Sequence, residues 1–226
     1  MAFSDKLYKI LIQGGSWKTI LGGLWVTIQI SALALLIGTV LGALICLLRT
    51  RKNPVARGIA SVYIAVLRGT PVLMLLLLFY YGVFARAGLA PVMVAVITFA
   101  LNVSAHVAEL LRSALEAADK GQAEAARTLG FSAWSTFRLV TLPQVLRIAK
   151  PVYQSTIVNL IQWTSVVGYV TITDLTRVIN NTASRTMQPM LTIIIGMLIY
   201  LALSYIIFGI FALTDRIKAK RRGAAA

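Results

Sequence analysis

The residues best suited to chemistry are an arginine at a helix-breaking sequence and two stripes of polar side chains, all within apolar sequence. The arginine belongs to Arg68-Gly69-Thr70-Pro71. Pro71 has no N–H to bond the carbonyl of Leu67, and Gly69 lets the backbone bend, so this segment predicts a broken or kinked helix. A guanidinium beside free backbone groups at such a break is typical of a transporter substrate site. The alternative is that Arg68 extends to the nearer water interface.

The polar stripes recur at helical spacing. The first is Asn102, His106 and Glu109, and the second is Ser155, Asn159, Gln162 and Ser165. Polar groups facing lipid are unfavourable, so we expect both stripes to face protein or a water-filled cavity. The alternative is that they only form hydrogen bonds between helices. Glu109 also has a structural explanation, since Arg112 lies three residues further on and can pair with it.

The sequence argues against catalytic and metal-dependent classes of protein. His106 is the only histidine and stands beside no nucleophile, and Cys46 is the only cysteine, so no metal site or catalytic residue is expected. A phosphate loop of the form G-x-x-x-x-G-K-[ST] is absent, so the chain is not expected to hydrolyse ATP itself. We therefore expect no enzyme activity and no cofactor on this chain.

Composition predicts an all-α, polytopic membrane protein. The 226 residues are 58% hydrophobic and 13% charged, and the mean hydropathy is +0.82. Apolar stretches long enough to cross a bilayer predict five spans in a single transmembrane domain covering residues 1–226. The expected spans are 19–48, 58–85, 88–112, 150–172 and 188–214. The first and last contain few polar residues and are expected at the periphery. No cleavage-site pattern is present near the N-terminus, so no removed signal peptide is expected.

The distribution of basic residues predicts the topology. Of the 22 Lys and Arg residues, fifteen fall on one side of the predicted spans, six on the other, and Arg68 lies within a span. This bias places the N-terminus outside and the C-terminus in the cytoplasm. The net charge of +15 is thus interpreted as a topology signal and not as a nucleic-acid surface. Residues 113–149 are expected in the cytoplasm, and the polar segment 171–189 is expected to be the largest external loop.

The cytoplasmic segment 113–149 predicts a short helical hairpin. Gly130 is expected to end its first helix in a left-handed turn, Ser132 to begin the second, and Pro143 to end it. Alanines at 123, 125 and 126 permit close approach of another backbone, so the first helix suits a groove on a soluble partner. Glu124 and Arg127 would set its orientation.

Several motifs resemble those of a known family. Glu124-Ala125-Ala126, followed by Gly130 and by Leu142-Pro143, resembles the Glu-Ala-Ala loop of ABC importer permeases. Four further segments are similar to the branch of that family that takes up polar amino acids: Arg68-Gly69-Thr70-Pro71, Ala108-Glu109 through Lys120-Gly121-Gln122, Thr164-Ser165 and Asp174-Leu175. His106, Gln162-Trp163 and Met190 depart from the usual pattern of the branch near the expected pathway, which affects the choice of solute.

The resemblance implies five spans with a coupling-helix hairpin between spans three and four, in a bacterial cytoplasmic (inner) membrane. It implies a second permease subunit, identical or related, two cytoplasmic ATPase subunits that bind ATP and Mg, and an external binding protein that delivers an amino acid. The ATPase-coupling residues would be Glu124, Ala125, Ala126, Arg127, Leu129, Gly130, Phe131, Leu142 and Pro143. The substrate-pathway residues would be Arg68, Gly69, Thr70, Pro71, Asn102, His106, Glu109, Gln162, Thr164, Ser165 and Asp174.

Two other functions fit the same features. An ATP-independent secondary transporter or a channel subunit could also have five spans and an intramembrane arginine, although Glu109 is the only carboxylate in a predicted span. A membrane scaffold that recruits a soluble protein through residues 113–147 is the third. ATP dependence would distinguish an ABC importer permease from a secondary transporter or channel. Any solute flux would distinguish both of these from a scaffold.

Overall fold

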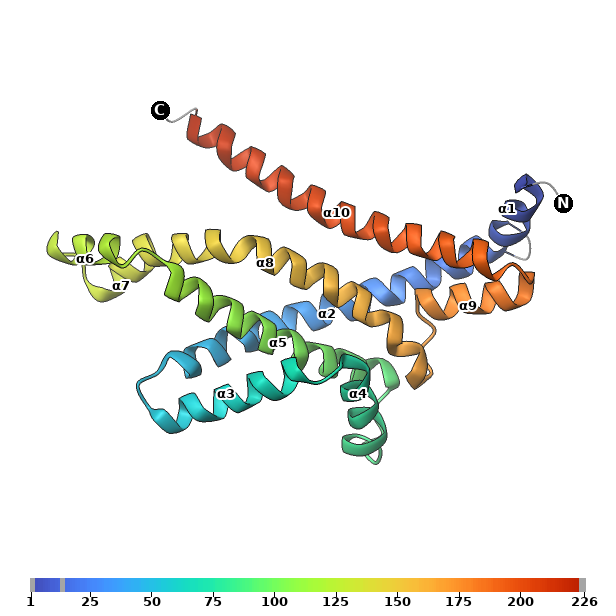
Figure 1. Cartoon of the computed structure of the whole chain (residues 1–226), viewed down its shortest axis with the longest axis horizontal. Helices are drawn as coiled ribbons and strands as arrows, with labels where there is room; N and C mark the ends of the chain where they lie inside the picture. The colour runs from blue at the N-terminus through green and yellow to red at the C-terminus, as the bar shows by residue number, and fades with distance from the viewer. Residues whose placement is uncertain (1–2, 13–14, 224–226) are drawn as a thin grey trace. The chain divides into compact units, whose positions relative to one another are not determined.

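The computed structural model of the chain is built from helices (Figure 1). It describes residues 3–12 and 15–223, without the side chains of residues 3, 6 and 218–223. In chain order the elements are α1 (Phe3–Leu11), α2 (Ser16–Thr50), α3 (Pro54–Gly69), α4 (Val72–Leu77), the π-helix η2 (Leu78–Val83), α5 (Pro91–Ala117), α6 (Lys120–Thr128), α7 (Ala133–Thr136), the π-helix η3 (Phe137–Thr141), α8 (Leu142–Trp163), the 3₁₀ helix η4 (Thr164–Val170), α9 (Leu175–Thr186) and α10 (Pro189–Gly223). The described chain is thus all-α, as predicted.

The chain divides into two compact units that interleave along the sequence. The first unit contains Met1–Ala34, Val72–Phe99 and Ile157–Ala226, and the second contains Leu35–Pro71 and Ala100–Thr156. The helix break at Arg68–Pro71 and the polar residues Asn102, His106 and Glu109 therefore belong to the second unit. Gln162, Thr164, Ser165 and Asp174 belong to the first.

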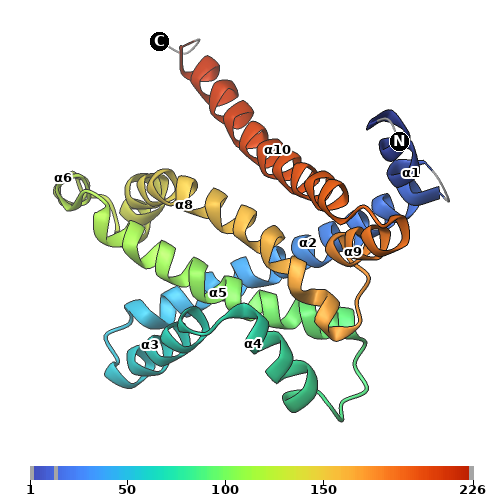
Figure 2. The same ribbon diagram turned by 45° about the vertical axis from the view of Figure 1, so that its right-hand side comes forward.

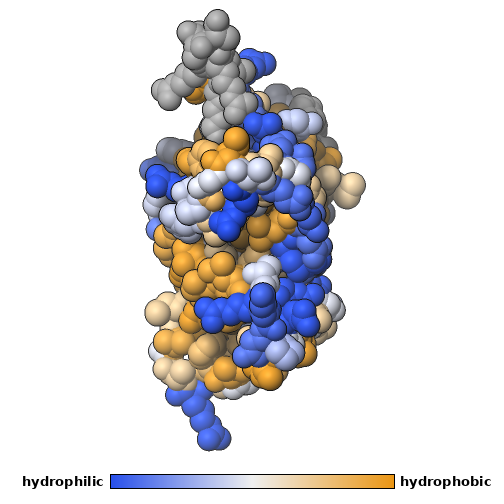
Figure 3. All heavy atoms as spheres, turned by 90° about the vertical axis from the view of Figure 1, so that its left-hand side faces the viewer, coloured by the Kyte–Doolittle hydropathy of each residue, from blue (hydrophilic) through white to orange (hydrophobic). Residues whose placement is uncertain are grey.

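Three helices are long and apolar enough to cross a membrane: α2, α5 and residues Pro189–Ile217 of α10. Helix α3 and the segment Val72–Val83 qualify only together, as a pair bent at the break between them. Helix α8 is not among these candidates, because polar and charged side chains along it lower its hydropathy. Large hydrophobic side chains such as Leu36, Ile59 and Met197 are exposed on these helices, and hydrophobic residues cover much of the surface seen in Figure 3. Such surfaces suit contact with lipid acyl chains.

In the second unit, α2 packs closely against α5 through two glycines one turn apart. A Cβ on Gly38 would lie 2.8 Å from the backbone oxygen of Ala100, and one on Gly42 would lie 2.6 Å from Cβ of Val107. Small residues at this spacing let helices approach each other within a membrane. Helix α3 also contacts α5, because the Tyr63 hydroxyl lies 2.6 Å from Oγ of Ser104.

The segment between α5 and α8 contains the two short helices that the sequence predicts. Gly130 has φ of +88°, and the Ser132 side chain caps α7 by accepting from the N–H of Ser135. The prediction that Pro143 ends this segment is wrong, because α7, η3 and α8 follow one another without a break. Pro143 is the second residue of α8 and directly follows the π-helix η3, so it lies inside a continuous helical segment.

The segment 171–189, which the sequence predicts to be the largest external loop, contains a helix, because twelve of its residues form α9. The buried Asp174 side chain caps this helix, and Leu175, Val178 and Ile179 pack with Ile20 into an apolar cluster of the first unit. Figure 2 shows α9 beside the start of α10, and Ile179 lies against Gly196 of α10. An amphipathic helix explains why the polar residues here alternate with apolar ones.

Candidate functional site

The broken helix begins the candidate site. Helix α3 ends at Gly69, and Thr70 adopts an extended conformation with φ of −104° and ψ of 133°, as a residue before proline prefers. The Thr70 hydroxyl donates to the carbonyl of Val66 at 2.8 Å. The chain becomes helical again at Val72. The predicted break at Arg68–Pro71 is therefore confirmed.

The carbonyl that Pro71 leaves without a helical partner is bonded by a side chain from another helix. Nδ2 of Asn102, in α5, donates to the backbone oxygen of Leu67 at 2.8 Å. Asn102 is only 2% exposed, and its Oδ1 has no partner in the described part of the chain. Only the amide nitrogen can donate to a carbonyl, so this contact fixes the orientation of the amide. The polar stripe of α5 thus holds the broken end of α3.

Arg68 lies directly after this anchored carbonyl. Its side chain is exposed, and no hydrogen bond or ion pair to it is found among the described residues. Because Asn102 bonds the carbonyl of the residue before it, Arg68 lies in the same region of the second unit as the polar stripe of α5. His106 is half-buried on the same side of α5 as Asn102, one turn away. The break in α3 and the polar stripe of α5 therefore lie together in this unit.

Glu109 is committed to an ion pair, as its spacing to Arg112 predicts. Nη2 of Arg112 lies 2.7 Å from Oε1 of Glu109, and Nη1 of the same guanidinium contacts Glu116. Because this carboxylate is already paired with Arg112, it is less available to bind a charged group of a solute than the exposed guanidinium of Arg68 is. Glu109 therefore has a structural role near the end of α5.

In the first unit, two predicted pathway residues are occupied by local hydrogen bonds. Thr164 is fully buried, and its hydroxyl donates to the carbonyl of Ile161 at 2.7 Å. Asp174 is also fully buried and accepts from the backbone N–H groups of Thr176 and Arg177, at 3.0 Å each. Burial raises the pKa of the Asp174 carboxyl, and the cap hydrogen bonds oppose that shift. Ser165, by contrast, lines an open cavity with Arg177.

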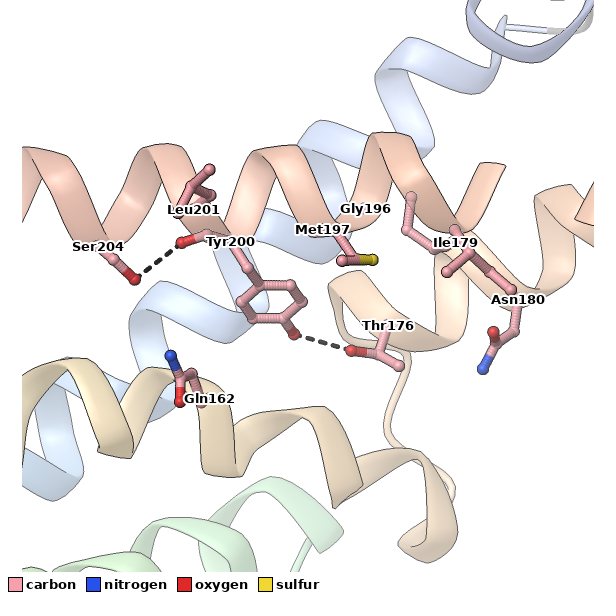
Figure 4. Close-up of a pocket in the computed structure, with 10 residues that line it drawn as sticks. Gln162, Thr176, Ile179, Asn180, Gly196, Met197, Tyr200, Leu201 and Ser204 are labelled. Carbon is pink, nitrogen blue, oxygen red and sulfur yellow. Dashed lines mark hydrogen bonds between the residues drawn. The ribbon is translucent and has the colours of Figure 1, made fainter. Parts of the chain in front are cut away.

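Gln162 lines a cavity of about 410 Å³ between the end of α8, α9 and α10 (Figure 4). Its amide points toward Tyr200, whose hydroxyl lies 2.8 Å from Oγ1 of Thr176. The Ser204 hydroxyl donates to the Tyr200 carbonyl at 3.0 Å. Asn180 also lines this cavity. Thr176, Asn180 and Tyr200 were not predicted as site residues from the sequence. Tyr200 and Ser204, four residues apart in an apolar helix, nevertheless form a polar stripe of the kind found in α5.

The coupling segment presents an exposed surface on α6 and α7. Ala126 is buried, whereas Glu124 and Arg127 are exposed and Leu129 is 79% exposed. Exposed Phe131 adds a second large hydrophobic group, and so does Trp134, which the sequence analysis did not single out. An apolar patch flanked by charges is typical of a protein-docking surface.

This surface is held in place by α5 and α8. An apolar cluster joins the end of α5 to the start of α8, and its buried members are Leu110, Ala114, Ala118, Val145 and Ala149. The Gln144 side chain accepts from the N–H of Asp119 at 3.0 Å and donates to the Gln122 side chain at 3.1 Å. Of the predicted coupling residues, Leu142 and Pro143 thus lie at the base of this support, in the first turn of α8.

Comparison with known proteins agrees with this arrangement. Residues 16–219 match the family described as binding-protein-dependent transport system inner membrane component. The probable amino-acid ABC transporter permease protein YckA of Bacillus subtilis (strain 168) is 36% identical over 190 residues, which cover 83% of this chain and 84% of the relative. The L-cystine transport system permease protein TcyB of the same organism is 33% identical over 186 residues, with coverage of 82% and 80%.

Solved structures give the same result for the fold. The crystal structure of an amino acid ABC transporter with histidines contains a chain with a TM-score of 0.80 and 31% identity, covering 88% of this chain and 94% of that one. An inward-facing structure of the MetNI methionine ABC transporter matches with a TM-score of 0.73 at 17% identity, which supports the fold alone. The chain belongs to the family of binding-protein-dependent transport system inner membrane components, the permease subunits of ABC importers.

Proposed function

We propose that this permease translocates an amino acid that an external binding protein delivers. The observation that carries the proposal is Arg68, an exposed arginine without a described partner at the end of a broken helix. A guanidinium binds a carboxylate through paired, charge-assisted hydrogen bonds, and a carboxylate is the group that all amino acids share. The relatives whose names specify amino acids or L-cystine support this solute class.

The transmembrane arrangement that we propose has five spans. Helices α2, α5 and α10 supply three, the pair α3–α4 supplies a broken one, and α8 with η4 supplies the fifth. The excess of Lys and Arg on one side places the N-terminus outside and α6 and α7 in the cytoplasm. Five spans are few to enclose a pathway, so a second permease subunit, identical or related, would complete it.

The energy for transport would come from ATP hydrolysis by a pair of ATPase subunits docked on α6 and α7. The exposed Leu129, Phe131 and Trp134 would enter an apolar groove, and Glu124 and Arg127 would contact its rim. ATP binding would close the two ATPases and draw the docked helices together. Because α6 is anchored to α8 through Gln144, this movement would reach the helices that line the pathway. ATP and Mg would bind to the partner and not to this chain.

Uptake by the complete transporter tests the proposal. The chain would be purified with its co-purifying subunits, reconstituted into vesicles with ATP enclosed, and supplied with the binding protein and a panel of radiolabelled amino acids. We expect uptake of at least one amino acid that requires hydrolysable ATP. Uptake that proceeds without ATP would instead indicate a secondary transporter or channel, and uptake of only other solutes would reject the amino acid assignment.

A further inference from the structure

A cavity lined by arginines lies in the second unit at the turn between α2 and α3. Figure 1 shows this turn at its left. Its volume is about 590 Å³. Four arginines line it, and Glu116 is the only acidic residue that does so; the arginines are Arg49, Arg51, Arg57 and Arg112. Neither the transport pathway nor the coupling surface described above includes this cavity.

Two of the arginines are fixed in the cavity wall. Nη1 of Arg49 donates to the hydroxyl oxygen of Ser61, and that hydroxyl donates to the carbonyl of Arg57 at 2.6 Å. Arg112 is held by Glu109 and Glu116. The Glu116 carboxylate is therefore already in use and does not neutralise the other guanidinium groups.

The remaining two arginines have unused hydrogen-bonding capacity. Arg51 and Arg57 are exposed, and the described residues provide neither side chain with a hydrogen bond or an ion pair. The first N–H groups of α3 cannot serve a ligand instead, because Asn53 Oδ1 already accepts from Val55 at 2.9 Å and from Ala56 at 3.4 Å. Any ligand would therefore be recognised by the guanidinium groups, whose planar donors match the oxygens of a phosphate.

The position of the cavity indicates where the phosphate comes from. Arg49 is in the last turn of α2, which is long and apolar enough to span the membrane, so the cavity opens where that span ends. At that depth a bilayer presents lipid head groups, and basic pockets between transmembrane helices on the cytoplasmic side bind anionic ones. We propose that this cavity binds the phosphate group of an anionic phospholipid in the cytoplasmic leaflet. The proposal is independent of which solute is transported.

The test measures lipid binding to the full chain purified with its co-purifying subunits and stripped of lipid. Phosphatidylglycerol, phosphatidylcholine and inorganic phosphate would be titrated separately, with bound lipid measured by native mass spectrometry and stability by thermal unfolding. The variant is Arg51→Gln with Arg57→Gln. The matched control is Arg138→Gln with Arg147→Gln, which removes two exposed arginines from the same predicted side but outside the cavity.

We expect phosphatidylglycerol to bind the wild type and to raise its unfolding temperature, and phosphatidylcholine not to do so. The cavity variant should bind phosphatidylglycerol about 30-fold more weakly, because each basic side chain near an anionic surface contributes about a fivefold effect. The control should match the wild type. Equal weakening in both variants, or equal binding of both lipids, would overturn the proposal. If inorganic phosphate stabilises the protein as well as phosphatidylglycerol does, the cavity is a free-anion site and the lipid source is rejected.

Added salt should weaken the binding of phosphatidylglycerol to the unaltered protein, which provides a test without substitution.

Discussion

The side-chain amide of Asn102 donates to the backbone carbonyl of Leu67 at 2.8 Å and so replaces the N–H that Pro71 lacks. The two residues lie 35 positions apart and belong to different helices of the second unit. The break in α3 is therefore a fixed structure and not a flexible joint, since the carbonyl that Pro71 leaves without a helical donor is hydrogen-bonded within the protein. Arg68, next to that carbonyl, is presented from an anchored helix end.

Replacing Asn102 with alanine should destabilise the protein. The substitution leaves a buried carbonyl at Leu67 without a donor, which costs about 1–3 kcal/mol. Thermal unfolding in detergent would measure the loss. Thr98→Val is the matched control, because the buried Thr98 hydroxyl bonds only within its own helix, to the carbonyl of Val94 at 2.8 Å. Equal stability of the two variants would contradict the anchoring role of Asn102.

Both partners of this contact are visible in the sequence, but the contact itself is not. Gly69 and Pro71 predict the break from local chemistry, and the spacing of Asn102 and His106 predicts a polar face. Which side chain reaches the carbonyl of Leu67 depends on the register between α3 and α5, and no local pattern encodes that register. The sequence also contains Gly38 and Gly42 at the spacing of close helix packing, a signal that the analysis of the first span did not use.

Segment 171–189 shows the opposite case. Its local pattern indicates a helix, but its polar composition led to the prediction of an external loop. Asp174 is a good capping residue, and Leu175, Val178, Ile179 and Thr182 follow at the spacing of one helical face. The polar residues between them suggested a loop, yet they occupy the other face of α9. Helix α6 was predictable because its signals are local: Asp119 caps its start and Gly130 follows its end with a positive φ.

Alanine at Gly42 should weaken the packing of α2 on α5. A Cβ there would lie 2.6 Å from Cβ of Val107 and 2.8 Å from the backbone oxygen of Ser104, and neither atom can move away without shifting a helix. Overpacking of this kind costs about 1–3 kcal/mol. Gly22→Ala, in the same helix but with no atom within 4 Å of the added Cβ, is the control and should unfold at or above the wild-type temperature. If Gly42→Ala unfolds at the same temperature as Gly22→Ala, the close contact does not determine stability.

The stability of the protein should depend on pH through Asp174. Burial raises the pKa of this carboxyl in the folded state, so the folded protein binds its proton more tightly than the unfolded chain does. That contribution to stability is complete below the unfolded pKa of about 3.9 and is lost as pH rises through the higher folded value. Asp174→Asn keeps an oxygen that can cap α9 and should remove this part of the pH dependence in unfolding measured from pH 4 to 7. An unchanged slope would show that Asp174 does not titrate as described.

Reversing the charge of Glu124 should separate the permease from its ATPase. Glu124 is exposed on α6 beside the apolar patch, so an arginine there places a cation where the proposed contact has an anion. A pull-down of Glu124→Arg, with co-purifying chains identified by mass spectrometry, should recover less ATP-binding subunit than the wild type. Asp5→Arg makes the same reversal in α1, which lies outside in the topology that we propose, and should retain the subunit. Retention by both variants would remove α6 from the docking surface.

Removing the guanidinium of Arg68 should impair transport more than removing any other exposed arginine outside the coupling surface. A hydrogen bond to a charged group contributes about 1.5–3 kcal/mol, so Arg68→Ala should lower kcat/KM for uptake by about tenfold or more. Arg68→Lys should recover only part of the loss, because an ammonium cannot bond both oxygens of a carboxylate in a fixed fork. Arg86→Ala, an exposed arginine beyond η2, is the control and should transport like the wild type. The measurement is initial uptake in reconstituted vesicles over a range of solute concentrations. If Arg68→Ala and Arg86→Ala gave the same kcat and KM, Arg68 would not contact the solute, and the cavity lined by Gln162 would become the site to test next.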